Sequence, residues 1–139
     1  MSMEIALARI VLAGIIGFLI GATTKELTKM RLFSMVCMGA ALVTYISSQF
    51  FIPLSMTWYA DPGRLSAQII VALGFIGSGL IWVSPEKKVE GLATAASLWL
   101  TAVIGMALGA GLTSVTEAII LFLVILYLVQ KLFAKISKR

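Results

Sequence analysis

The chain contains no histidine and only one cysteine, Cys37, among its 139 residues. These scarcities exclude histidine-based acid–base catalysis, histidine metal ligands and a disulfide within the chain. No GxSxG sequence is present, and the glycine-rich stretch GFIGSG lacks the lysine of a phosphate-binding loop. Cys37 has no histidine to activate it and is typical of a small buried residue. We therefore expect a protein that is not an enzyme and holds no cofactor.

Charge is also scarce. Charged residues make up 12% of the chain and hydrophobic residues 60%, with a mean hydropathy of +1.06. A water-soluble domain of this size would expose too much apolar surface, so the composition predicts a protein embedded in a lipid bilayer. The net charge of +5 does not indicate nucleic-acid binding, because the basic residues lie between apolar segments.

The apolar residues form five segments near the length of about 20 residues that spans a membrane. They cover residues 5–23, 33–54, 65–83, 92–112 and 115–133. We predict an all-α, polytopic protein with five transmembrane helices in a single domain, 1–139. Only Thr113 and Ser114 separate the last two segments. Two helices are favoured over one bent helix there, because Ser114 to Glu117 has the pattern of a capping box.

Basic residues predict the orientation of these helices. Nine of the eleven fall in the first and third connections and in the C-terminal tail: Lys25, Lys29, Arg31, Lys87, Lys88, Lys131, Lys135, Lys138 and Arg139. With five spans, these three regions share one side of the membrane. The positive-inside rule then places the N-terminus outside and the C-terminus in the cytoplasm.

Glycines cluster in the first, third and fourth segments. The candidate packing positions are Gly17, Gly21, Gly74, Gly77, Gly79, Gly105 and Gly109. Small residues let membrane helices approach closely, so we predict a tight bundle of these three helices. The fifth segment contains no glycine and is expected to lie at the periphery.

Polar residues are spaced along one face of the third and fourth segments. Gln68 shares a helical face with Phe75 and Gly79, and Thr94, Ser97 and Thr101 share a face of the next segment. If the two faces meet, they form a lightly polar seam across much of the bilayer. Two interpretations remain open: these side chains hold helices together, or they line a path for a ligand or cation.

The third segment begins with Asp61, Pro62 and Arg64. Asp61 is typical of an N-cap, Pro62 of the first helical position, and Arg64 lies within reach of the Asp61 carboxylate. The alternative is that Asp61 collects a divalent cation at the mouth of a path. Hard cations normally require several oxygen ligands, usually with more than one carboxylate. The chain has only one aspartate and five glutamates, so the sequence does not define a metal site and leaves the metal unknown.

Two long stretches resemble the MgtC/SapB family of bacterial inner-membrane proteins. They are DPGRLSAQIIVALGFIGSGLIW, residues 61–82, and VEGLATAASLWLTAVIGMALGAGL, residues 89–112. The upstream segment MRLFSMVCMGAAL, residues 30–42, is similar to a further family motif. Thr23 and Thr24 stand where the family usually has a charged Glu-Arg-Glu cluster, and the chain resembles a short, divergent member without the soluble C-terminal domain.

The resemblance implies a role in magnesium homeostasis and in adaptation to stress or to a host. It also implies action through other membrane proteins, such as the ATP synthase or a P-type Mg²⁺ pump. We expect a non-enzymatic, homo-oligomeric inner-membrane protein. The alternative is a transporter or channel for Mg²⁺ or another cation that uses the seam between the third and fourth segments.

Overall fold

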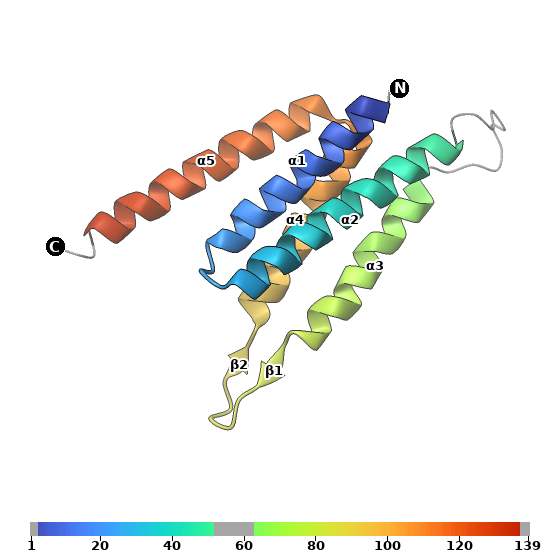
Figure 1. Ribbon diagram of the computed structural model, residues 1–139. Helices are drawn as coiled ribbons and strands as arrows, with labels where there is room; N and C mark the ends of the chain where they lie inside the picture. The colour runs from blue at the N-terminus through green and yellow to red at the C-terminus, as the bar shows by residue number, and fades with distance from the viewer. Residues whose placement is uncertain (1–2, 52–62, 137–139) are drawn as a thin grey trace.

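The computed structural model describes residues 3–51 and 63–136, most of which are helical (Figure 1). The elements are α1 (Met3–Ala22), α2 (Leu27–Phe51), α3 (Gly63–Gly79), β1 (Trp82–Val83), β2 (Val89–Glu90), α4 (Leu92–Ala110) and α5 (Thr113–Ile136). Among the described residues, three helices are long and apolar enough to cross a membrane, over Glu4–Ala22, Leu27–Gln49 and Leu92–Ala110. The apolar stretches Gly63–Gly79, which is α3, and Thr113–Val129, within α5, are shorter. The predicted all-α class fits this architecture.

Two element boundaries differ from the prediction. Helix α2 begins at Leu27 rather than at residue 33, because the polar residues before the apolar run continue the same helix. Helix α3 ends at Gly79, and residues predicted as its end instead form a small antiparallel hairpin. In that hairpin Val83 pairs with Val89, and the Ser84 amide donates to the Lys88 carbonyl at 2.8 Å.

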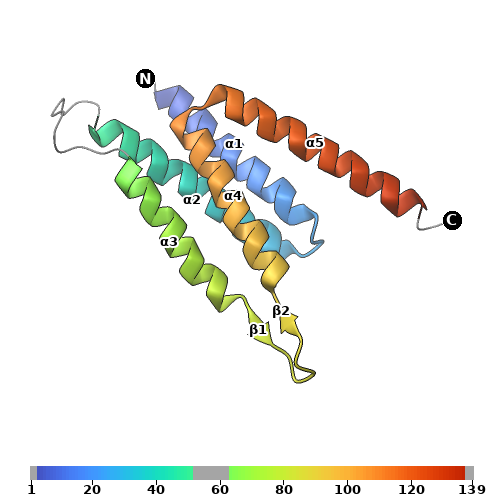
Figure 2. The same ribbon diagram turned by 180° about the vertical axis from the view of Figure 1, so that it is seen from behind.

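The helices form a bundle in which α2 lies against both α1 and α4 (Figures 1 and 2). Helix α3 packs on α4 and α2, and α5 diverges from the other helices, as both views show. The peripheral position of α5 agrees with the prediction. In the predicted bundle of the first, third and fourth helices, α1 and α3 each contact α4, but the closest packing is with α2, which the prediction left out of the bundle.

The glycines of α1 and α4 explain this central place, because both sets face α2. A Cβ at Gly17 would collide with the Phe33 carbonyl, and one at Gly21 with the Met30 backbone. On the other side, Cβ atoms at Gly105 and Gly109 would collide with the backbone of α2 at Cys37 and Ala41, respectively. The core cluster joins the three helices through Ala13, Ile16, Cys37, Ala41, Ile104 and Leu108. Because these glycines have no side chains, α1 and α4 can each approach the backbone of α2 closely.

Helices α4 and α5 are separate, as predicted, but the break has a different cause. Gly111 is left-handed, with φ 74°, at the C-cap of α4. The Leu112 and Gly111 amides donate to the carbonyls of Ala107 and Leu108, which is a Schellman motif. Helix α5 already begins at Thr113, so Ser114 lies inside its first turn and is not the N-cap that the capping-box pattern predicted.

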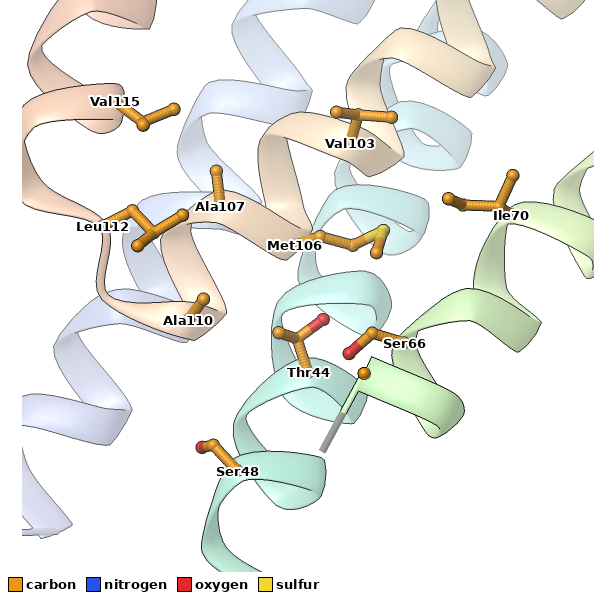
Figure 3. Close-up of a pocket in the computed structure, with 11 residues that line it drawn as sticks. Thr44, Ser48, Ser66, Ile70, Val103, Met106, Ala107, Ala110, Leu112 and Val115 are labelled. Carbon is orange, nitrogen blue, oxygen red and sulfur yellow. The ribbon is translucent and has the colours of Figure 1, made fainter. Parts of the chain in front are cut away.

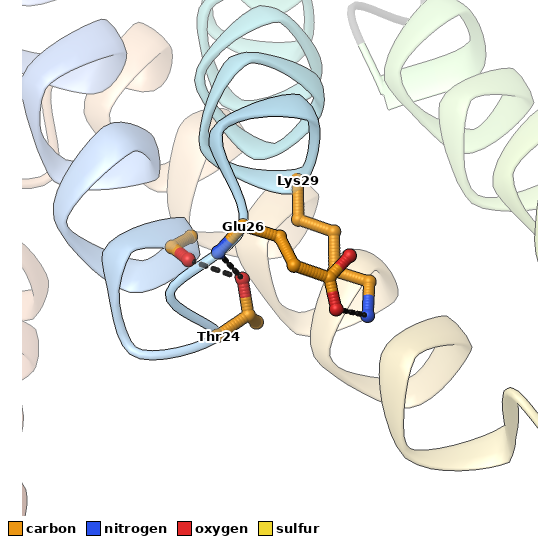
Figure 4. Close-up of polar contacts among 4 residues, drawn as sticks. Thr24, Glu26 and Lys29 are labelled. Atoms are coloured by element: carbon orange, nitrogen blue, oxygen red, sulfur yellow. Dashed lines mark hydrogen bonds and ion pairs between the residues drawn. The ribbon is translucent and has the colours of Figure 1, made fainter.

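Hydroxyl groups close the turn between α1 and α2. The Thr23 and Thr24 hydroxyls donate to the carbonyls of Ile20 and Gly21, each at 2.7 Å. Glu26 directly precedes α2, accepts a hydrogen bond from the Met30 amide and forms an ion pair with Lys29 at 2.8 Å (Figure 4). The two hydroxyls thus add second hydrogen bonds to carbonyls at the end of α1 that already accept the Thr23 and Thr24 amides.

Candidate functional site

The face of α3 that carries Gln68 does not pack against α4. Gln68 is exposed, Phe75 is 82% exposed, and a Cβ at Gly79 would have no neighbour within 4 Å. The buried residues of α3 are Leu73 and Gly77. Thus the described structure does not bring the two predicted polar faces together, and the seam between α3 and α4 is not assembled within one chain.

The polar residues of α4 bond mostly to their own helix. Thr101 is fully buried and its hydroxyl donates to the Ser97 carbonyl at 2.7 Å. Ser97 is exposed and donates to the Ala93 carbonyl at 2.8 Å, while Thr94 is half-buried. Thr101 lies one turn before Gly105, so it shares the face of α4 that contacts α2 rather than α3.

The mouth of the predicted path is described only in part. Asp61 and Pro62 lie outside the described residues, so the cap, the ion pair and the cation site at Asp61 remain predictions. Arg64 is exposed in the first turn of α3. Within residues 3–51 and 63–136, no group of three or more histidine, cysteine, aspartate or glutamate side chains could hold a metal ion.

A cavity of about 530 Å³ lies near the end of the bundle where α2 and α4 finish and α3 begins (Figure 3). Its walls come from α2, α3, α4 and the start of α5. The lining residues are Thr44, Ser48, Gly63, Ser66, Ile70, Val103, Met106, Ala107, Ala110, Leu112 and Val115. The lining is mostly apolar; Thr44 and Ser66 lie side by side in the close-up, and Ser48 lies one turn farther along α2. The sequence prediction did not include this site.

Thr44 is the most unusual residue of this lining. It is 7% exposed, and its hydroxyl has no hydrogen-bond partner in the described part of the chain. Thr44 and Ser48 are spaced four residues apart in an apolar helix, which places them on one face. That spacing is the signal by which the sequence could have indicated the cavity.

Comparison with known proteins identifies relatives over most of the chain. The model of the MgtC family matches residues 10–138. Protein MgtC of Salmonella typhimurium LT2 is 40% identical over 103 residues, which are 71% of this chain and 41% of that protein. Protein SapB of Bacillus subtilis 168 is 34% identical over 125 residues, 86% of this chain and 53% of that protein.

YhiD of Escherichia coli K12 is 38% identical over 109 residues, which are 75% of this chain and 50% of that protein. It is named as a candidate magnesium transporter. The chain thus spans about half the length of these curated relatives. No solved structure matches the chain. The family match covers nearly all of the sequence, and it includes the glycine-lined helices and the cavity described above, so the chain belongs to the MgtC family.

Proposed function

We propose that the protein is a multi-pass protein of the bacterial inner membrane. In this topology all five helices span the bilayer, the N-terminus is outside and the C-terminus is cytoplasmic. The asymmetric placement of nine of the eleven basic residues supports this orientation. A fluorescent protein fused to the C-terminus is expected to fluoresce, and alkaline phosphatase at the same position to be inactive. The reverse pattern would contradict the topology.

In this membrane the protein acts without catalysis, by contacting other membrane proteins, and serves magnesium homeostasis or adaptation to stress and virulence. The observation that carries this proposal is the uncovered face of α3. Gly74 and Gly79 have no neighbour within 4 Å of a Cβ, and Phe75 is 82% exposed. The glycines of α1 and α4 face α2, whereas α3 keeps an open surface. Close approach through glycine is a main route by which membrane helices associate.

The partner on this face is a second copy of the chain or a larger membrane protein, such as the ATP synthase or a P-type Mg²⁺ pump. A photoreactive phenylalanine analogue at Phe75 would test this in native membranes. Phe122, which is 56% exposed on α5, is the matched control position. We expect a discrete protein adduct from position 75 that position 122 does not give. Lipid adducts alone at both positions would contradict the proposal.

A second candidate is transport of Mg²⁺ or another cation. Two observations favour it: one relative is named as a candidate magnesium transporter, and the polar side chain of Gln68 is exposed on α3. In an oligomer, Gln68 and Asp61 from several copies could form a ring around a pore. Purified protein in liposomes with an internal Mg²⁺-sensitive dye separates the two candidates. Saturable uptake that Gln68→Leu abolishes would establish transport and refute the purely interacting role.

A further inference from the structure

The cavity between α2, α3 and α4 is open to its surroundings and has the volume of a ligand site. Its volume of about 530 Å³ falls in the range of roughly 300–1,000 Å³ that is typical of small-molecule pockets. Ile70, Val103 and Met106 provide apolar walls. The hydroxyl-bearing residues Thr44 and Ser66 face each other across the cavity wall in the close-up (Figure 3). No charged side chain is among the lining residues in the described part of the chain.

The hydroxyl of Thr44 indicates that the ligand must supply a hydrogen-bond acceptor. Other hydroxyls in these helices donate to their own backbone: Ser48 to the Tyr45 carbonyl at 2.7 Å and Thr101 to the Ser97 carbonyl at 2.7 Å. Thr44 is 93% buried, yet its Oγ1 has no partner in the part of the chain that the structure describes, and it points toward the cavity in Figure 3. A buried hydroxyl without a partner is costly, so a group in the cavity is expected to accept its hydrogen bond.

The position of the cavity narrows the choice of ligand. Ser48 lies three residues before the end of α2, Ser66 is in the first turn of α3, and Ala110 ends α4. The hydroxyl-bearing end therefore lies near the ends of these helices, where the hydrocarbon of a bilayer gives way to the ester and headgroup layer. The described lining residues do not suit a bare cation, because a cation would need several oxygen ligands and a compensating charge.

Charges around the cavity are suited to a lipid phosphate. Arg64 is exposed and directly follows the lining residue Gly63. The Arg9 guanidinium contacts Gly111, directly before the lining residue Leu112. We propose that the cavity binds one acyl chain of a phospholipid, whose ester carbonyl accepts a hydrogen bond from Thr44 Oγ1. In this proposal the phosphate would lie near these two arginines.

Lipid binding by the purified full chain can be measured by titration in detergent with dioleoyl phosphatidylglycerol and with its diether analogue. The diether has the same chains and headgroup but no carbonyl. We expect the wild type to bind the diester about threefold to tenfold more tightly than the diether, and Thr44→Val to lose this preference. Thr101→Val is the control, since its hydroxyl already bonds its own helix and does not line the cavity.

If Thr44→Val preferred the diester over the diether as strongly as the wild type does, the proposed hydrogen bond from Thr44 would be refuted.

Filling the cavity is a second, independent test. Ala110→Leu is expected to weaken binding of the diester at least tenfold, while Ala96→Leu, also on α4 but outside the lining, is not. Equal binding by both leucine variants, with thermal unfolding showing that both are folded, would refute the site.

A photoreactive diazirine side chain in place of Val103 identifies the occupant directly. An adduct with phosphatidylglycerol in vesicles of that lipid is the expected result. A cross-linked dimer in its place would show that a second copy of the chain fills the cavity, and would overturn the lipid assignment.

Discussion

Replacing Gly109 by alanine tests whether close contact between α4 and α2 stabilises the bundle. A Cβ at Gly109 would collide with the backbone of Ala41, which cannot move without shifting α2. Overpacking of this kind costs about 1–3 kcal/mol. The same substitution gains up to about 1 kcal/mol of helix propensity, so the net effect of the single variant is difficult to interpret without a reference.

Gly74→Ala supplies that reference. Gly74 lies in the middle of α3, and a Cβ there would have no neighbour within 4 Å. Both variants receive the same gain in helix propensity, which cancels in their difference. We expect Gly109→Ala to be about 1–3 kcal/mol less stable than Gly74→Ala.

The free energy of unfolding can be measured by titration from a mild detergent into a denaturing one, with circular dichroism as the signal. Gly74→Ala is expected to equal or exceed the stability of the wild type. If the two variants were equally stable, the packing of α2 against the glycines of α4 would be refuted as a stabilising contact.

Three further predictions concern single sites. Gly111→Ala should lower the free energy of unfolding by about 1–2 kcal/mol, because a left-handed alanine is strained and its Cβ would meet the Arg9 guanidinium; an unchanged unfolding midpoint would contradict this. Cys37 is fully buried, so a maleimide should label it only after denaturation, and rapid labelling in mild detergent would argue against the core position. The ion pair of Glu26 and Lys29 is exposed on one helix turn, so Glu26→Gln should change stability by less than about 0.5 kcal/mol; a larger loss would show that the pair has a role beyond the helix surface.

Several features followed from local sequence. The apolar runs indicated the helices, and they indicated a break between the last two, although Gly111 makes that break and not the predicted cap at Ser114. The lack of glycine in the last segment correctly predicted that α5 would be peripheral. The buried position of Cys37 was also predicted, and the structure confirms it. Each of these inferences depends on a residue and its near neighbours in the chain.

Such local patterns do not determine which helices pack against each other. Glycine indicates that a backbone can come close but not which one, so the sequence did not show that α2 would fill both glycine faces and that Gly74 and Gly79 would stay open. The same limit applies to Thr44. In the sequence its spacing from Ser48 indicates only a polar face of α2, and the packing of α3 and α4 around that face leaves the Thr44 hydroxyl buried beside a cavity, with no partner in the described part of the chain.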